Sequence, residues 1–404
     1  MNEFMRIGDI CDILNGYAFK SSKYVADGIR VIRITNVQKG FVEDTNPQYY
    51  PVSEQREIEK YMLCEGDLLM SLTGNVGRVG LLSAEMLPAA LNQRVACIRI
   101  RNPAVIYKPF LFHLLNSDYF ENKCILASQG VAQKNMSTEW LKEYPIPSFS
   151  MDKQMEIASI FDKIDDLIAR RKEQVRNMDQ AVKSRFIELF GDPIANPLGW
   201  PVKRLDDISV LITNGNTPKG GSDNYVSEGI VFLRSQNVWR NKIDLDDVAY
   251  IDAATHADMA KSSLHDKDIL ITKTGRINTE NSSLGRAALF RGADNSANIN
   301  GHVYLVRLDR TTVPEYVVAI LTGEPYRRYI RKVCVGGIDK RQINLDQVED
   351  FPIILPPIEL QEQFAAFVEQ TDKSKYYSSL SFRYCQAAAN TYRQEWMTCR
   401  TSDF

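Results

Sequence analysis

The chain of 404 residues lacks the sequence features of metal-binding, disulfide-rich and membrane proteins. Its seven cysteines form no Cys-x-x-Cys pair and its four histidines are far apart, so neither a zinc site nor a disulfide framework is expected. No apolar run approaches about 18 residues, and the N-terminus carries no secretory signal pattern. The composition predicts a cytoplasmic protein with reduced thiols, no bound metal and no membrane contact.

The chain also lacks the motifs of enzymes that act on DNA. No phosphate-binding Gly-x-x-x-x-Gly-Lys-Ser/Thr loop is present. An amino-methyltransferase needs a glycine-rich cofactor loop and an Asn-Pro-Pro-aromatic turn around a flipped base. Residues 46–49 (NPQY) only approach such a turn. The three pairs of consecutive aspartates, at 165–166, 206–207 and 246–247, have no partner lysine at the spacing that nucleases use. We therefore predict no catalytic residue and no cofactor bound by this chain. The net charge of −2 does not indicate a nucleic-acid binder, although it can conceal basic patches.

What the sequence does contain is an internal repeat with an offset of about 201 residues. Six segments recur in the same order, which predicts two copies of one domain. The matching pairs are GIRVIRITNV (28–37) with GIVFLRSQNV (229–238), GDLLMSLTG (66–74) with KDILITKTG (267–275), VGRVG (76–80) with LGRAA (284–288), NQRVACIRI (92–100) with NGHVYLVRL (300–308), GVAQKNM (130–136) with GIDKRQI (337–343), and YPIP (144–147) with FPII (351–354).

A long amphipathic helix is predicted between the two copies. Apolar residues recur at three- and four-residue steps from residue 157 to 189, and Gly191 with Pro193 is a helix stop signal. A helix of roughly 35 residues is about 50 Å long, more than one domain needs to cover its core. We therefore predict a spacer that also packs on a partner helix, through Ile157, Phe161, Ile164, Ile168, Val175, Met178 and Val182.

Each copy has the pattern of a mixed α/β domain. The runs DLLMSLTG and DILITKTG predict buried strands that end in a Thr-Gly turn, and residues 109–126 and 314–333 have helical spacing. The predicted fold class is α/β (α+β), with two repeated domains and long antiparallel coiled-coil helices in a pseudo-two-fold arrangement. The predicted boundaries are 1–150 and 194–357 for the domains, and 151–193 and 358–404 for the helices.

Candidate DNA-binding residues occupy matching places in the two copies. Arg, Lys, Asn and Gln are the side chains whose donors and acceptors match guanine and adenine in the major groove, while Arg and Lys also position phosphates. Generic polar turns are the alternative interpretation. In the first copy the candidates are Lys20, Thr73, Asn75, Arg78, Gln133, Lys134 and Asn135. In the second they are Lys219, Thr274, Arg276, Arg327, Arg331, Lys340, Arg341 and Gln342. For Arg33 and Arg234, buried pairing and phosphate contact are both open.

From residue 6 to about residue 375, the chain resembles the specificity subunits of type I restriction-modification systems. The resemblance rests on the Thr-Gly strand ends, the loops QKN and KRQ, the PIP exit and the helix ending in FIELFGDP. It implies that each repeat is a target-recognition domain that reads half of a split double-stranded DNA sequence. It implies a non-catalytic subunit whose long helices set the half-site separation and dock two methyltransferase (modification) subunits. Those subunits would methylate adenine at N6 with S-adenosylmethionine, and motor-nuclease (restriction) subunits, using ATP and Mg²⁺, would cleave unmodified DNA.

The tail departs from the family pattern after Lys375. Residues 376–404 are rich in Tyr, Ser and Cys and weak in heptad pattern, so the sequence leaves open whether the closing helix pair continues there, although 387–397 keeps helical character. Two other functions stay open at this point. One is a solitary DNA methyltransferase or endonuclease, and the other is a protein-binding scaffold with duplicated modules.

Overall fold

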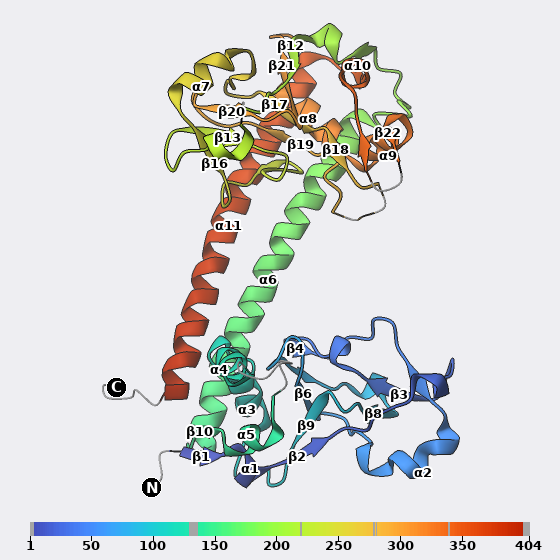
Figure 1. Cartoon of the computed structure of the whole chain (residues 1–404), viewed down its shortest axis with the longest axis vertical. Coiled ribbons are helices and arrows are strands. Elements are labelled where there is room, and N and C mark those ends of the chain that lie inside the picture. The colour runs from blue at the N-terminus through green and yellow to red at the C-terminus, as the bar shows by residue number, and fades with distance from the viewer. Residues whose placement is uncertain are drawn as a thin grey trace. The chain divides into compact units, whose positions relative to one another are not determined.

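The computed structural model describes residues 4–128, 136–218, 220–277, 279, 281–337 and 340–398. The chain divides into two compact units (Figure 1). Unit 1 comprises Met1–Glu173 and Ser379–Phe404, and unit 2 comprises Gln174–Ser378. None of the helices in the described ranges combines the length and the apolar character that crossing a membrane requires.

Unit 1 is built on a five-stranded sheet in the order β2-β9-β6-β7-β4, beside a three-stranded sheet in the order β5-β3-β8 and the pair β1-β10. The central strand β6 is buried along its whole length, as predicted for the run that ends in Thr-Gly. The strands of unit 1 are β1 Phe4–Arg6, β2 Cys11–Asn15, β3 Ile29–Ile32, β4 Gly40–Phe41, β5 Tyr49–Tyr50, β6 Leu68–Ser71, β7 Val79–Leu81, β8 Ala89–Leu91, β9 Val95–Ile100 and β10 Pro145–Pro147.

Both faces of this sheet are covered, because alternate side chains of a strand point to opposite faces. Leu68 and Met70 join one core with helices α3 and α4, whereas Leu69 joins a second core with Leu63 and Leu82. The helices of unit 1 are α1 Ile7–Ile10, α2 Gln55–Ile58, α3 Lys108–Leu115, α4 Asp118–Ser128, α5 Thr138–Glu143 and the first part of α6 Met151–Phe190.

Unit 2 repeats this architecture. The sheet β12-β21-β17-β19 corresponds to β2-β9-β6-β7, and β16-β13-β20 corresponds to β5-β3-β8. Three smaller sheets are β11-β24, β14-β15 and β18-β23-β22. The strands are β11 Val202–Arg204, β12 Ser209–Asn214, β13 Ile230–Leu233, β14 Val238–Trp239, β15 Lys242–Ile243, β16 Ala249–Ile251, β17 Ile269–Thr272, β18 Thr274–Gly275, β19 Ala287–Leu289, β20 Ala297–Ile299, β21 Val303–Leu308, β22 Val335–Gly336, β23 Arg341–Gln342 and β24 Pro352–Ile354.

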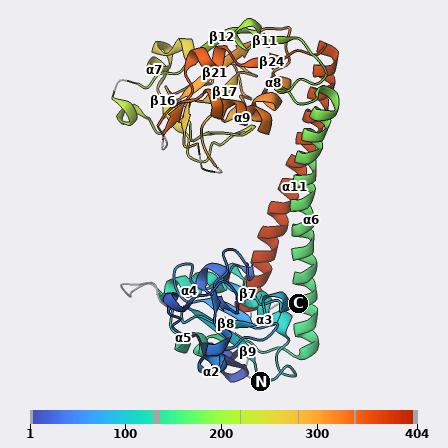
Figure 2. The ribbon, with the colours of Figure 1, turned by 90° about the vertical axis from the view of Figure 1, so that its right-hand side faces the viewer.

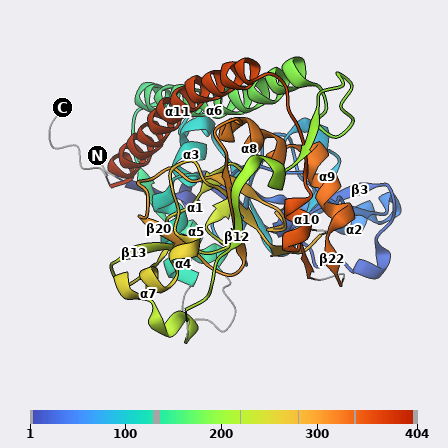
Figure 3. The same ribbon diagram turned by 90° about the horizontal axis from the view of Figure 1, so that it is seen from above.

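Each of the two predicted domain helices is in fact two helices. The segment 109–126 is broken between α3 and α4 at Ser117, whose hydroxyl accepts a hydrogen bond from the Phe120 amide and thereby begins a new helix. The segment 314–333 is broken at Gly323, an extended residue followed by Pro325 in the first turn of the next helix. The helices of unit 2 are α7 Ala253–Asp258, α8 Pro314–Thr322, α9 Glu324–Val333, α10 Leu345–Glu349 and the first part of α11 Ile358–Thr398 (Figure 3).

A buried ion pair holds the same place in both units. Asp67 accepts hydrogen bonds from Arg99 Nε at 2.9 Å and Nη2 at 2.5 Å. In unit 2, Asp268 accepts from Arg307 Nε at 2.8 Å and Nη2 at 2.7 Å, and its carboxylate is only 1% exposed. The repeat therefore duplicates a charged core contact as well as the apolar pattern.

The residues of the predicted stripe on the central helix are at least partly buried. Ile157 and Phe161 are buried, and Ile164, Ile168, Val175, Met178 and Val182 are half-buried. Helix α6 packs against helix α11 within each unit (Figure 2). In unit 1, Arg393 lies over the ring of Phe161 and Lys172 over the ring of Phe382. In unit 2, Lys375 pairs with Asp179 at 2.9 Å and Phe364 meets Phe186. As the residue number of the contact increases along α6, the residue number of its partner decreases along α11, so the two helices run antiparallel.

The question that the sequence left open for the tail has an answer in the structure, where α11 continues without a break from Ile358 to Thr398. Its last part covers unit 1 with an unusual stripe in which Ala389 is 0% exposed and Arg393 is 9% exposed. Arg393 Nη2 donates to both carboxylate oxygens of Asp165 at 2.7 Å, and Trp396 packs on Phe149. The heptad pattern does not reveal this stripe, because small and charged residues stand at positions that leucine usually occupies.

A buried histidine lies under this part of unit 1. His113 is 3% exposed, and its Nε2 lies 2.8 Å from Asp162 Oδ1, with Nδ1 3.6 Å from Asp165. Burial lowers the pKa of His113 below its ordinary value of 6.5 and outweighs the raising effect of Asp162 and Asp165. The neutral ring is therefore the form that the folded unit favours.

Candidate nucleic-acid interface

The Thr-Gly strand ends of both units open into loops that are held in the same way. In unit 1, the Ser71 hydroxyl accepts a hydrogen bond from the Arg78 amide at 3.1 Å. In unit 2, the Thr272 hydroxyl accepts from the Arg286 amide at 2.8 Å. The loop from the strand end to Arg78 or Arg286 is thus closed at its base by one hydroxyl in each unit. The predicted residues Asn75 and Arg276 are exposed on these two loops, and Thr73 and Thr274 are half-buried.

A glycine in each loop brings it against a helix. Gly285 has φ +63°, and an added Cβ would lie 2.7 Å from Ile330 Cδ1 on α9. Gly77 has φ +87°, and an added Cβ would lie 2.7 Å from Cys124 Cβ on α4. Only glycine fits both the left-handed backbone and the close approach. These contacts also show that Cys124 and Ile330 are equivalent positions of the two copies.

The second predicted loop lies beside the strand end in unit 2, and in unit 1 Met136, the first residue described after that loop, holds the same place. The Met136 amide donates to the Leu72 carbonyl at 2.9 Å, and the Ile343 amide donates to the Lys273 carbonyl at 2.9 Å. In unit 2, β18 also pairs with β23, so that Thr274 is opposite Gln342 and Gly275 is opposite Arg341. The fold thus joins two candidate segments nearly 70 residues apart in sequence. Gln133, Lys134 and Asn135 lie outside the described residues.

The side chains of this second loop in unit 2 differ in their exposure to solvent. Lys340 and Gln342 are exposed, whereas Arg341 is half-buried. Arg341 Nη1 donates to the Cys334 carbonyl at 3.3 Å, and Gln342 Nε2 donates to Asn344 Oδ1 at 3.1 Å. Lys340 and Gln342 are therefore the residues of this loop best placed to meet a ligand.

A third loop, which the sequence analysis did not select, completes the interface. The Leu72 amide donates to the Arg94 carbonyl at 3.0 Å, and the Lys273 amide donates to the His302 carbonyl at 2.9 Å. The exposed residues Arg94 and His302 follow equivalent Asn turns, which are NQR in the first copy and NGH in the second. The occurrence of these tripeptides at equivalent places of the two copies is the signal in the sequence that points to this loop.

Lys20 lies apart from the strand-end loops, near helix α2 of unit 1. It is exposed at the start of the short 3₁₀ turn Ser21–Lys23, and its charge acts on Glu57 of α2. Its loop reaches the interface only indirectly, through the hydrogen bond from the Gln93 amide to the Tyr17 carbonyl at 2.9 Å. The structure therefore does not group Lys20 with Thr73 and Arg78. Lys219, its counterpart in the second copy, lies outside the described residues.

Arg33 and Arg234 each pair with a backbone carbonyl. Arg33 Nη2 donates to the Asn46 carbonyl at 2.7 Å, and Arg234 Nη2 donates to the Asp247 carbonyl at 2.7 Å. Both bonds close equivalent loops, which agrees with the pairing interpretation.

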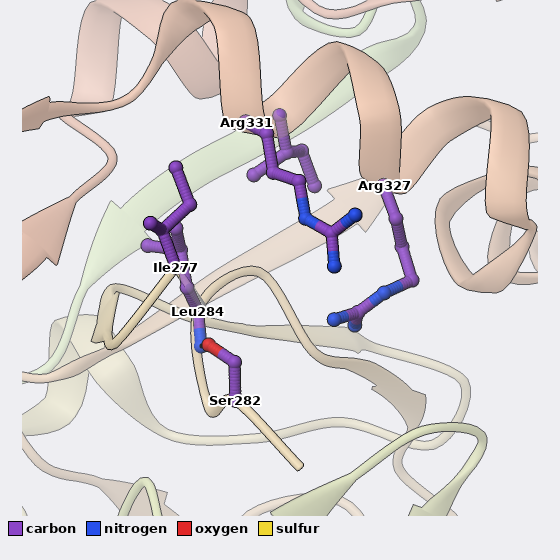
Figure 4. A pocket seen from close by; sticks show the side chains of 6 residues that line it. Ile277, Ser282, Leu284, Arg327 and Arg331 are labelled. Atoms are coloured by element: carbon purple, nitrogen blue, oxygen red, sulfur yellow. The ribbon is translucent and has the colours of Figure 1, made fainter. Parts of the chain in front are cut away.

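Helix α9 brings two further predicted residues to the loop that follows β18. Arg327 and Arg331 extend from α9 toward the loop that carries Ser282 and Ile277, where they line a small hollow (Figure 4). Arg331 is exposed, but Arg327 is only 5% exposed and its Nε has no hydrogen-bond partner among the described residues. Arg328 and Lys332, two other basic residues of this helix, are exposed and do not line the hollow.

The fold and the loops define a protein with two copies of one α/β domain, each of which carries matching polar loops at the end of its central strand in the part of the chain that the structure describes. The chain belongs to the family described as "Type I restriction modification DNA specificity domain", whose sequence model matches residues 2–177 and 197–376. The two matches correspond to the two copies of the repeat.

Individual relatives agree with this assignment. The type I restriction enzyme EcoBI specificity subunit of Escherichia coli is 25% identical over 395 residues, which cover 89% of this chain and 77% of the relative. The MjaVIII specificity subunit of Methanocaldococcus jannaschii is 27% identical over 185 residues. That match spans 45% of this chain and less than half (43%) of the archaeal protein. The crystal structure of a type I S subunit from M. genitalium shares the fold, with a TM-score of 0.54 and 13% identity over 98% of this chain and 95% of that one.

Proposed function

We propose that this chain is the DNA sequence-recognition subunit of a type I restriction-modification complex, and that each unit reads one half of a two-part duplex target. The observation that carries the proposal is the convergence of three polar loops on the end of one buried strand in unit 2, together with the matching strand-end loop and Asn-turn loop in unit 1, in both copies of the family's DNA specificity domain. Arg94, Lys340 and Gln342 have the donors and acceptors that base edges and phosphates require.

The chain itself carries out no catalysis in this proposal. Methylation of adenine at N6 belongs to two methyltransferase subunits that hold S-adenosylmethionine, and cleavage belongs to motor-nuclease subunits that use ATP and Mg²⁺ in the cytoplasm. Ile160 and Leu167 support a docking role for helix α6, because they lie two turns apart on one side of the helix and are 38% and 51% exposed. The paired helices α6 and α11 would also set the separation of the half-sites.

Methylome sequencing of a host with and without this gene and its partners tests the proposal. We expect N6-methyladenine in a split motif that appears only with the gene. Methylation or cleavage by the purified chain alone would favour a solitary enzyme instead. A chain that never shifts duplex DNA, even with methyltransferase subunits present, would favour a protein-binding scaffold.

Loop variants assign each unit to its half-site. The double variant Lys340→Ala and Gln342→Ala should change or abolish one half of the motif, and Gln133→Ala with Asn135→Ala should affect the other half. Arg328→Ala is the matched control, because this exposed arginine lies outside the hollow beside the loop. The assignment of the loops fails if both double variants alter the same half, or if neither alters the motif.

A further inference from the structure

Unit 2 contains a group of four arginines that converge on one loop. Arg327 and Arg331 approach Ser282 from α9, and Ser282 also lines a second hollow of about 530 Å³ together with Arg240 and Arg286. Arg286 is 6% exposed, and its guanidinium lies 3.9 Å from the ring centroid of Trp239. We call Arg240, Arg286, Arg327 and Arg331 the arginine cluster.

The described residues around the arginine cluster balance its positive charge only in part. Asp244 lines the same hollow as Arg240 and Arg286, but its carboxylate pairs with Lys242 at 3.3 Å. Of the four guanidinium groups, only that of Arg331 lies within 4.0 Å of a described carboxylate, the exposed Glu324. Burial and then repulsion from Arg240 lower the pKa of both Arg286 and Arg327. A buried cation without a counter-charge is costly, so a cluster of this kind is typical of a site whose anion comes from a ligand.

The equivalent place in unit 1 is neutralised from within. Lys39 corresponds to Arg240 in the repeat, and its Nζ lies 2.5 Å from Asp118 Oδ1 and 2.8 Å from Glu121 Oε2. Glu121 corresponds to Arg327, because each residue precedes by three the helix position that the loop glycine touches, Cys124 or Ile330. The fold thus places an ion pair in one unit and two repelling cations in the other.

The loop arginine itself is satisfied in both units. In unit 1, Arg78 Nη1 donates to Gln38 Oε1 at 2.8 Å. At the matching position of unit 2, Gln38 is replaced by Trp239, whose ring covers Arg286, and Arg286 donates through Nε to the Ser282 carbonyl at 3.0 Å and through Nη2 to the Asn281 carbonyl. The donor left without a partner among the described residues is the buried Nε of Arg327, beside the exposed Arg240 and Arg331.

We propose that the arginine cluster binds phosphate groups of the DNA backbone next to the half-site that unit 2 reads, and that unit 1 has no equivalent site. The inference rests on the proposed function. Arginine forks match phosphate oxygens, and the cluster borders the loop that leaves the Thr274–Gly275 strand end. Unit 2 then supplies more of the salt-dependent affinity than unit 1.

The test is the salt dependence of duplex DNA binding by the full chain, since each phosphate contact contributes about 0.9 to the slope of log K against log salt. Arg331→Ala removes an exposed arginine and should lower the slope by about 1. Arg327→Glu places a carboxylate beside Arg240, which imitates the pairing of Lys39 with Glu121, and should lower the slope by about 2. Because unit 1 already folds with that pairing, this variant should remain folded, which circular dichroism would verify.

Lys39→Ala is the matched control and should leave the slope unchanged. An unchanged slope in both arginine variants, while the wild type binds DNA, overturns the inference and leaves the proposed function intact. An equal fall in slope for Lys39→Ala and Arg331→Ala overturns the asymmetry. A wild-type chain that binds no duplex DNA, alone or with its methyltransferase partners, overturns the proposed function and this inference together.

Discussion

The contact of the tail with unit 1 can be tested by replacing Arg393 with alanine. Arg393 donates to both oxygens of Asp165 and covers the ring of Phe161. Hydrogen bonds to a charged group contribute about 1.5–3 kcal/mol, and a cation over a ring about 0.5–2 kcal/mol. Asp165 is 46% exposed and can be rehydrated after the change, which reduces the loss. We therefore expect Arg393→Ala to destabilise unit 1 by about 1.5–3 kcal/mol.

Differential scanning calorimetry can measure this loss. At about 2–4 °C per kcal/mol for a domain of this size, the transition of unit 1 should fall by roughly 3–12 °C. Hydrogen exchange should become faster in the first half of α6 and in residues 379–398, and it should stay unchanged in the strands of unit 2. A double-mutant cycle with Asp165→Ala should give a coupling energy of about 1–2 kcal/mol.

Arg383→Ala is the control for this experiment, because Arg383 is an exposed arginine ten residues earlier on the same helix. We expect it to change stability by less than about 0.5 kcal/mol. The reasoning is refuted if Arg393→Ala and Arg383→Ala have the same effect, or if exchange accelerates equally in unit 2. Either result would mean that the last part of α11 does not stabilise unit 1.

Three further predictions concern the cores of the units. Asp268→Ala should cost about 3–5 kcal/mol by leaving the Arg307 guanidinium without its carboxylate, against less than about 1 kcal/mol for Asp244→Ala, because Asp244 is half-buried and pairs with the exposed Lys242. Both are measured by urea unfolding. Unit 1 should lose stability as pH falls below 6.5, by at most about 1.4 kcal/mol per pH unit, because unfolding lets His113 take up a proton. His113→Gln should remove this pH dependence. If the variant keeps the pH profile of the wild type, His113 is not the group responsible. Gly285→Ala should destabilise unit 2 by about 1–3 kcal/mol, so an unchanged melting temperature would disprove the close approach to α9.

The repeated architecture was predictable because its signals are local. A buried strand needs a short apolar run, and residues 68–71 and 269–272 have one in each copy. The stripe on α6 follows from apolar spacing alone, since residues three and four apart share one helix face. The order of the repeats then required both copies to adopt the same sheet, and the matching pairs of strands confirm it.

The continuation of α11 was not predictable by the same rule. The buried face of its last part consists of residues such as Ser378, Ala389 and Arg393, which a hydrophobic pattern does not register. Their burial depends on what lies opposite them, namely the large ring of Phe161 and the carboxylate of Asp165. A pattern within one helix cannot contain that information, because it belongs to the partner helix.

The sequence by itself determined the duplication, the central strand ends and the polar loops that bear the candidate side chains. Only the tertiary structure decided which of those side chains meet. Trp239, Arg286 and Arg327 are separated by more than 40 residues at each step, yet they surround one loop, whereas Lys20 lies in another neighbourhood. Charge balance is a property of such distant neighbours. The contrast between the neutral site of unit 1 and the arginine cluster of unit 2 therefore emerges only when the chain is folded.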